Sequence, residues 1–101
     1  MNILLPTSMT FEFRNFGEES VRFKFTAYFS KSSQHDIQKK FEIATKHAKK
    51  YDKTLKVKRV GLSGINVSGH MLKKVFGTMM ALEFMQWTNL GSLTLSELIT
   101  Y

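Results

Sequence analysis

A chain of 101 residues with 43% hydrophobic and 13% aromatic residues can bury a core of its own, so its composition excludes a disordered chain and predicts one domain over residues 1–101. It has no cysteine, which excludes disulfide frameworks, thiolate zinc sites and cysteine nucleophiles. No apolar run is long enough to span a membrane, and the N-terminus lacks the positively charged start of a signal peptide, so we expect a cytoplasmic protein without membrane contact.

The positive charge of the chain is concentrated in one segment. The net charge is +7, from 15 basic and 8 acidic residues. Residues 39–59 contain nine basic and two acidic residues, and the remainder of the chain, with six of each sign, is neutral. Such an asymmetry indicates an anionic partner.

The first third of the chain is expected to form an arm followed by a β-hairpin. Residues 1–8 are read as the arm, because Pro6 disfavours a regular start. Apolar and polar residues then alternate in residues 10–14 and again in residues 21–29, with turn residues between them. One face of the second strand is predicted to be buried and to carry Val21, Phe23, Phe25, Ala27 and Phe29.

A helix is expected next. Ser33 and Asp36 have the spacing of a helix N-terminal cap. The apolar residues that follow recur at helical spacing and predict a buried stripe of Ile37, Phe41, Ala44, Ala48 and Tyr51. The opposite side carries Lys39, Lys46, Lys49, Lys50 and Lys53, with Ile43 beside them as a partly exposed apolar residue.

Two short strands are predicted after this helix. Residues 54–60 alternate, with Leu55 and Val57 inward and Lys56 and Lys58 outward, and the break in alternation at Arg59 suggests a bulge or the strand end. A turn at residues 63–64 and alternation through residues 65–67 then predict a second hairpin.

The most apolar element is predicted as a long helix over Gly69–Trp87. Apolar residues lie on most of its sides, which predicts either the central helix of the core or a helix shared with another subunit. Intramolecular core packing is the favoured explanation of Gly77, Ala81, Met79 and Met80, while the small pair and the adaptable methionines keep a partner interface or a homodimer open. The tail, residues 92–101, favours a short helix over a strand.

These elements predict an α+β fold in which an antiparallel sheet packs against two helices, in the order ββα-ββ-α with a short C-terminal helix or strand. We predict a non-enzymatic protein that binds DNA or RNA mainly through phosphates, because concentrated cations bind phosphates irrespective of sequence. Lysine outnumbers arginine twelve to three, so weak base preference is expected. The predicted binding residues are Lys39, Lys46, Lys49, Lys50, Lys53, Lys56, Lys58 and Arg59.

Two alternatives remain open. The lysines are equally compatible with a solvated surface that keeps a small protein soluble. They are also compatible with a protein-interaction module, such as a small viral inhibitor or adaptor, that docks on an acidic partner. The interface expected in that case comprises Ile43, Gly77, Met79, Met80 and Ala81.

The remaining motifs do not predict a function. The aromatic residues at 23, 25 and 29 have the spacing of base-stacking strands, but core packing explains them better, and Tyr28 on the opposite face is the better stacking candidate. Gly64 and Gly69 have P-loop spacing, but His70 replaces the required lysine. The three histidines are scattered and no nucleophile or carboxylate pair stands out, so we expect no catalytic residues, metal or cofactor.

Overall fold

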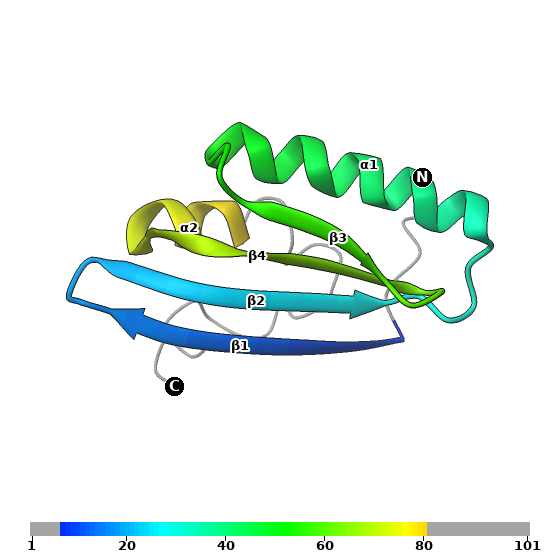
Figure 1. Ribbon diagram of the computed structural model, residues 1–101, viewed down its shortest axis with the longest axis horizontal. Coiled ribbons are helices and arrows are strands. Elements are labelled where there is room, and N and C mark those ends of the chain that lie inside the picture. Colours follow the sequence, from blue (N-terminus) through cyan, green and yellow to red (C-terminus); the bar gives the residue numbers. More distant parts are fainter. Residues whose placement is uncertain (1–6, 81–101) are drawn as a thin grey trace.

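The computed structural model describes residues 7–80, which form a four-stranded sheet covered on one face by two helices (Figure 1). The elements follow the order β1 (Ser8–Phe16), β2 (Ser20–Tyr28), α1 (Gln34–Tyr51), β3 (Lys56–Val60), β4 (Gly64–Leu72) and α2 (Lys73–Met79). The strands lie in the order β1-β2-β4-β3 and every neighbouring pair is antiparallel. The predicted α+β fold is therefore confirmed.

The first hairpin forms where the alternation predicts it. Gly17 adopts a φ of 79° in the turn between β1 and β2, a left-handed conformation that glycine reaches without strain. Thr7 already donates its backbone N–H to the carbonyl of Tyr28, and Ser8 belongs to β1, so the strand begins inside the predicted arm. The predicted inward residues of the second strand are all buried: Val21, Phe23, Phe25, Ala27 and Phe29.

Helix α1 packs its apolar stripe on the β3–β4 half of the sheet. The Ser33 hydroxyl accepts a hydrogen bond from the backbone N–H of Asp36 at 3.1 Å, which confirms the predicted cap. Ile37, Ala44 and Ala48 are buried, while Ile43 is 45% exposed as predicted. The helix therefore turns its lysine-rich side away from the sheet.

Of the two alternatives predicted at Arg59, the bulge is wrong and the strand end is confirmed, because β3 ends at the next residue, Val60. Strand β3 pairs with β4 without interruption, from Lys56 opposite Ser68 to Val60 opposite Gly64. Arg59 lies on the helix side of β3, where its guanidinium donates to the side-chain oxygens of Gln38 at 3.0 Å and Gln34 at 2.7 Å. Because α1 supplies these acceptors, an arginine occupies an inward position without any change in the strand.

The predicted start of the central helix at Gly69 is also wrong. Residues 68–72 continue β4, with Gly69 opposite Phe23 and Met71 opposite Val21 on β2. Helix α2 begins only at Lys73, and the predicted helix end near Trp87, together with the C-terminal tail, lies outside the described residues. Pairing with β2 and burial of Met71 favour the strand over the helix that the local sequence also permits.

Gly69 is required where β4 passes Leu55. A Cβ atom built on Gly69 would collide with the Leu55 side chain, which is itself fully buried. We expect Gly69→Ala to lower the free energy of unfolding by about 1–3 kcal/mol, the usual cost of overpacking. Chemical denaturation would measure this loss, with Ser68→Ala as the neighbouring control on the opposite face. An unchanged midpoint for Gly69→Ala would contradict close packing at this point.

Helix α2 closes the core over the β2–β4 half of the sheet. Phe76 is fully buried and its ring contacts those of Phe11, Phe13 and Phe23, at centroid distances of 6.0, 5.6 and 4.8 Å. Three residues of the predicted partner interface, Gly77, Met79 and Met80, are buried within this fold, and Ala81 lies outside the described residues. In residues 7–80, the methionines therefore serve the core.

Candidate nucleic-acid interface

The predicted lysine-rich segment is divided between two surfaces. Lys39, Lys46, Lys49 and Lys50 belong to α1, and Lys53 follows it in the turn to β3. Lys56 and Lys58 are exposed on the other face of the sheet, which neither α1 nor α2 covers and which we call the open face (Figure 1). Arg59 faces α1, so the eight predicted residues do not form one continuous binding surface.

On α1, the lysines differ in what they contact. Lys39, Lys46 and Lys50 are exposed and recur at helical spacing around Ile43. Lys49 instead donates to the backbone carbonyls of Lys53 and Leu55, at 3.2 and 3.0 Å, and so holds the turn after the helix. Lys39, Lys46 and Lys50 therefore form an exposed stripe of lysines with an apolar centre, and Lys53 is exposed beyond it in the turn.

Lys40, outside the predicted set, is partly buried beside this stripe. Its ammonium group lies 5.1 Å from the centroid of the Phe29 ring. Burial lowers the pKa of Lys40, and the carboxylate of Asp36 opposes that shift. Lys40 therefore packs against the core rather than extending the exposed stripe.

The turn between α1 and β3 is held by Asp52. Its carboxylate accepts hydrogen bonds from the Thr54 backbone N–H at 2.8 Å and from the Thr54 hydroxyl at 2.6 Å. These two bonds lower the pKa of Asp52, because they favour its charged form. The turn directs the chain into β3 and so sets the position of Thr54 and Lys56 beside the open face.

We expect this turn to loosen in acid. A carboxyl group whose pKa is lowered by folding stabilises the fold above its unfolded pKa, and that contribution is lost as the pH falls through the folded value, here below about pH 4. The wild-type protein should therefore lose more stability than Asp52→Asn between pH 5 and pH 3, measured by urea denaturation. Equal losses would show that Asp52 contributes nothing to the acid dependence.

The open face of the sheet carries basic side chains from β1, β2 and β3, and His70 from β4. Strand register places Arg14 of β1 directly opposite Arg22 of β2, and Arg22 directly opposite His70 of β4. The neighbouring row runs from Glu12 to Lys24, then to Ser68 and Lys56. Lys58 follows on β3. The open face therefore carries five cationic residues and His70, against one acidic residue: Arg14, Arg22, Lys24, Lys56, Lys58 and Glu12.

Within the chain that the structure describes, these cations outnumber the single acidic residue, Glu12, that shares their face. Like charges directly opposite each other destabilise a sheet, by roughly 0.2–1 kcal/mol per pair, and Arg14 and Arg22 are such a pair. No ion pair in residues 7–80 involves the five cations, and the carboxylates Glu18 and Glu19 lie exposed in the hairpin turn. An external anion would relieve the repulsion that the fold leaves in place.

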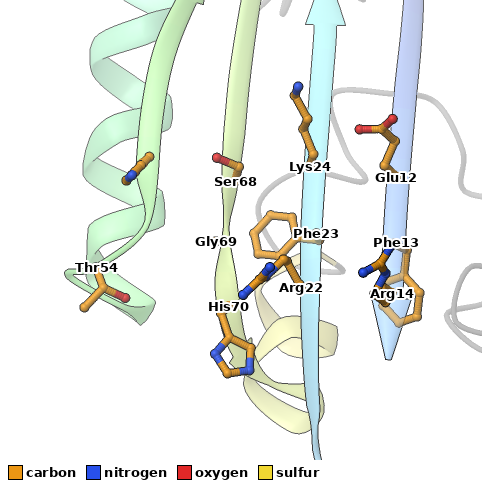
Figure 2. Close-up of a pocket in the computed structure, with 11 residues that line it drawn as sticks. Glu12, Phe13, Arg14, Arg22, Phe23, Lys24, Thr54, Ser68, Gly69 and His70 are labelled. Carbon is orange, nitrogen blue, oxygen red and sulfur yellow. The ribbon is translucent and has the colours of Figure 1, made fainter. Parts of the chain in front are cut away.

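A shallow hollow lies between the two rows (Figure 2). Its volume is about 630 Å³, within the usual range for ligand pockets. Figure 2 shows labelled side chains from β1, β2 and β4, and Thr54 in the turn between α1 and β3; Lys56 of β3 also lines the hollow. Phe13, Phe23 and Gly69 lie between the rows and form its floor. Four basic side chains project around it, together with Glu12 and His70: Arg14, Arg22, Lys24 and Lys56.

Aromatic rings lie at both ends of this face. Phe16 is 48% exposed at the β1–β2 turn, and Tyr28 is half-buried at the other end, beside the backbone of Gly64. The predicted core role of Phe23, Phe25 and Phe29 is confirmed, and Tyr28 is on the face predicted for it. The open face therefore combines cations with aromatic rings, as surfaces that bind single-stranded nucleic acids do.

Arg14 and Arg22 lie in predicted strands, but neither belongs to the predicted binding set. Arg14, Arg22 and Lys24 lie outside the segment that carries the net charge, and acids elsewhere in the chain cancel them in any sum. The signal that reveals them is alternation: they occupy the polar positions of the two strands, as Lys56 and Lys58 do in β3. Only strand pairing brings these polar positions onto one surface.

The described residues were also compared with a phosphate-binding loop, a metal site and a membrane-spanning helix. Gly64 and Gly69 lie within β4, so the sequence between them is a strand and not a phosphate-binding loop. Residues 7–80 contain no group of three or more histidine or acidic side chains placed to hold a metal ion. Over the same residues, no helix has the length and apolar character needed to cross a membrane. Comparison with known protein families, curated proteins and solved structures found no match to this chain.

Proposed function

We propose that this protein binds nucleic acid, without catalysis, through phosphate contacts on the open face of the sheet. The observation that carries the proposal is the row in which Arg14, Arg22 and His70 lie side by side on adjacent strands. Lys24, Lys56 and Lys58 extend the same surface. Of the residues predicted from the sequence, Lys56 and Lys58 therefore belong to the proposed site, and the α1 lysines form a separate surface.

Arginine strengthens this proposal. Two of the three arginines in the chain lie on this face, and the planar guanidinium binds phosphate through two parallel hydrogen bonds. Each cation that meets a phosphate releases condensed counterions, so affinity falls with salt in proportion to the number of contacts. Five contacts to a single strand predict a slope of about −3.5 in log K against log salt.

The direct test is fluorescence anisotropy with labelled DNA and RNA oligonucleotides across a salt series. A slope near −3.5 corresponds to an affinity about 100-fold weaker at 200 mM than at 50 mM salt. Such a dependence would support binding through the open face. An absence of binding at low salt, where a chain of net charge +7 should bind polyanions most readily, would reject the proposal.

A protein partner is the second candidate, and the exposure of Ile43 favours it. Ile43 is 45% exposed between Lys39, Lys46 and Lys50 on α1, an arrangement that fits an acidic protein surface with an apolar centre. In that case binding should survive high salt and should be lost on substitution of Ile43, because apolar anchors dominate protein interfaces. A pull-down at high salt with Ile43→Ser as the control distinguishes the two candidates.

A further inference from the structure

Phe16 is unusual among the phenylalanines of this fold. Eight phenylalanines lie in residues 7–80, and Phe16 alone is exposed, at 48%. It shares the open side of β1 with Glu12 and Arg14, and its strand partner is the small Ser20. An exposed ring at the edge of a basic surface is the arrangement on which bases stack, because every base has an apolar, polarisable face.

The ring of Phe16 is held in position by two neighbours. The Arg22 guanidinium lies 5.0 Å from the Phe16 ring centroid, in cation–π geometry. The His70 ring contacts Phe16 at 4.8 Å between centroids and at 69° between planes. Both neighbours belong to the row formed by Arg14, Arg22 and His70. A ligand that stacks on Phe16 therefore places its phosphates within reach of Arg22 and Arg14.

We infer that the nucleic acid is single-stranded and that one of its unpaired bases stacks on Phe16, an inference that rests on the proposed function. The hollow next to this ring, about 630 Å³ in volume, has room for an unstacked nucleotide between the cationic rows. A duplex keeps its bases paired and stacked inside, so it offers phosphates to the cations but no free base face to Phe16.

The surface shape supports the same ligand. Duplex DNA is commonly read by a helix or a two-stranded ribbon that enters the major groove, whereas open sheets with exposed aromatic rings bind single strands. Here the hollow lies across a four-stranded sheet, and residues of all four strands line it (Figure 2). A flexible strand can follow such a surface, with phosphates on the arginines and one base on Phe16.

The test compares Phe16→Leu with the wild-type protein by anisotropy on three probes: a single-stranded oligonucleotide, its duplex, and heparin, a polyanion without bases. Phe16→Leu keeps apolar bulk and removes the ring. Loss of one stacked base, worth roughly 1–3 kcal/mol, predicts single-strand binding that is about 5- to 150-fold weaker. The salt slope should not change, because no phosphate contact is removed. Phe16→Tyr should restore binding, since tyrosine also stacks.

Two controls separate stacking from other effects. Leu72 is 53% exposed at the same end of the sheet but has no ring, so Leu72→Ala should bind the oligonucleotide as the wild type does. Heparin should bind Phe16→Leu and the wild type equally, since it offers charge alone. If Phe16→Leu also lowered the affinity for heparin, the substitution would have displaced the neighbouring side chains Arg14 and Arg22, and the stacking role would be overturned.

The outcomes distinguish this inference from the proposed function. Preference for the single strand that depends on the ring supports both. Salt-dependent binding that is equal for single strand and duplex, or unaffected by Phe16→Leu, overturns the stacked base and leaves phosphate binding intact. An absence of binding to all three probes at low salt overturns both.

Discussion

Reversing two charges on the open face, in the double variant Arg22→Glu and Lys56→Glu, is expected to weaken nucleic-acid binding on the order of 100-fold at 50 mM salt. Two charge-assisted contacts of about 1.5 kcal/mol each are lost, which accounts for this factor. The salt slope should fall from about −3.5 to about −2, because three cations remain to meet phosphates. Anisotropy across the salt series measures both quantities on the same samples.

The matched control reverses two charges on α1, in Lys46→Glu and Lys50→Glu. Both double variants change the net charge by the same amount, so a difference between them reports position rather than total charge. The α1 variant should lose less than about fivefold, since screening over roughly 8 Å weakens the field that it exerts on the far face of the sheet. The opposite result would place the binding surface on α1, as the lysine-rich segment alone suggests.

The sheet variant should also remain folded. The carboxylate introduced by Arg22→Glu would lie opposite Arg14, which replaces a repulsive cross-strand pair with an attractive one. Lys56 lies opposite Ser68, so its reversal introduces no like-charge pair across the strands. A thermal transition close to that of the wild type would confirm that lost binding reflects lost charge.

Truncation of Phe76 is expected to have the largest effect on stability. The side chain is fully buried and contacts three rings from β1 and β2. Phe76→Ala should cost about 3–5 kcal/mol, the usual loss for a buried aromatic residue. That is a large part of the roughly 5–15 kcal/mol typical of a domain. The melting temperature should fall by about 15 °C or more, measured by circular dichroism.

Thr78→Ala provides the control within the same helix. Thr78 is exposed and its hydroxyl donates to the carbonyl of Lys74, so its loss should change stability by less than about 0.5 kcal/mol. Phe76→Leu should lie between wild type and Phe76→Ala, because it keeps part of the apolar volume. A small and equal effect of Phe76→Ala and Thr78→Ala would show that α2 does not close the core over the first hairpin.

Some of the fold follows from local patterns alone. Alternation identified the inward apolar face of β2, Val21, Phe23, Phe25 and Ala27, together with Phe29 just after the strand, because a strand can bury one face only if every second residue is apolar. The cap at Ser33 and the apolar stripe of α1 are equally local, since a helix repeats about every 3.6 residues. The outward direction of Lys56 and Lys58 is confirmed for the same reason.

The boundary between β4 and α2 could not be obtained in this way. The residues from Gly69 to Leu72 suit a helix as well as a strand, and their own sequence does not decide between them. Their pairing with β2 extends the sheet by four residues, and Gly69 lets the strand pass under Leu55. Both contacts join residues far apart in the chain, so only the tertiary structure selects the strand.

By itself, the sequence determined the fold class, the inward faces of β2 and α1, the concentration of charge in residues 39–59 and the absence of cysteine chemistry. The tertiary structure decided which charges share a surface. It turned the lysines of α1 and β3 in opposite directions, and it brought Arg14, Arg22 and His70 into one row. The net charge of a segment is the same whichever way its side chains point. A binding surface, in contrast, depends on strand register and on which face of the sheet the helices cover.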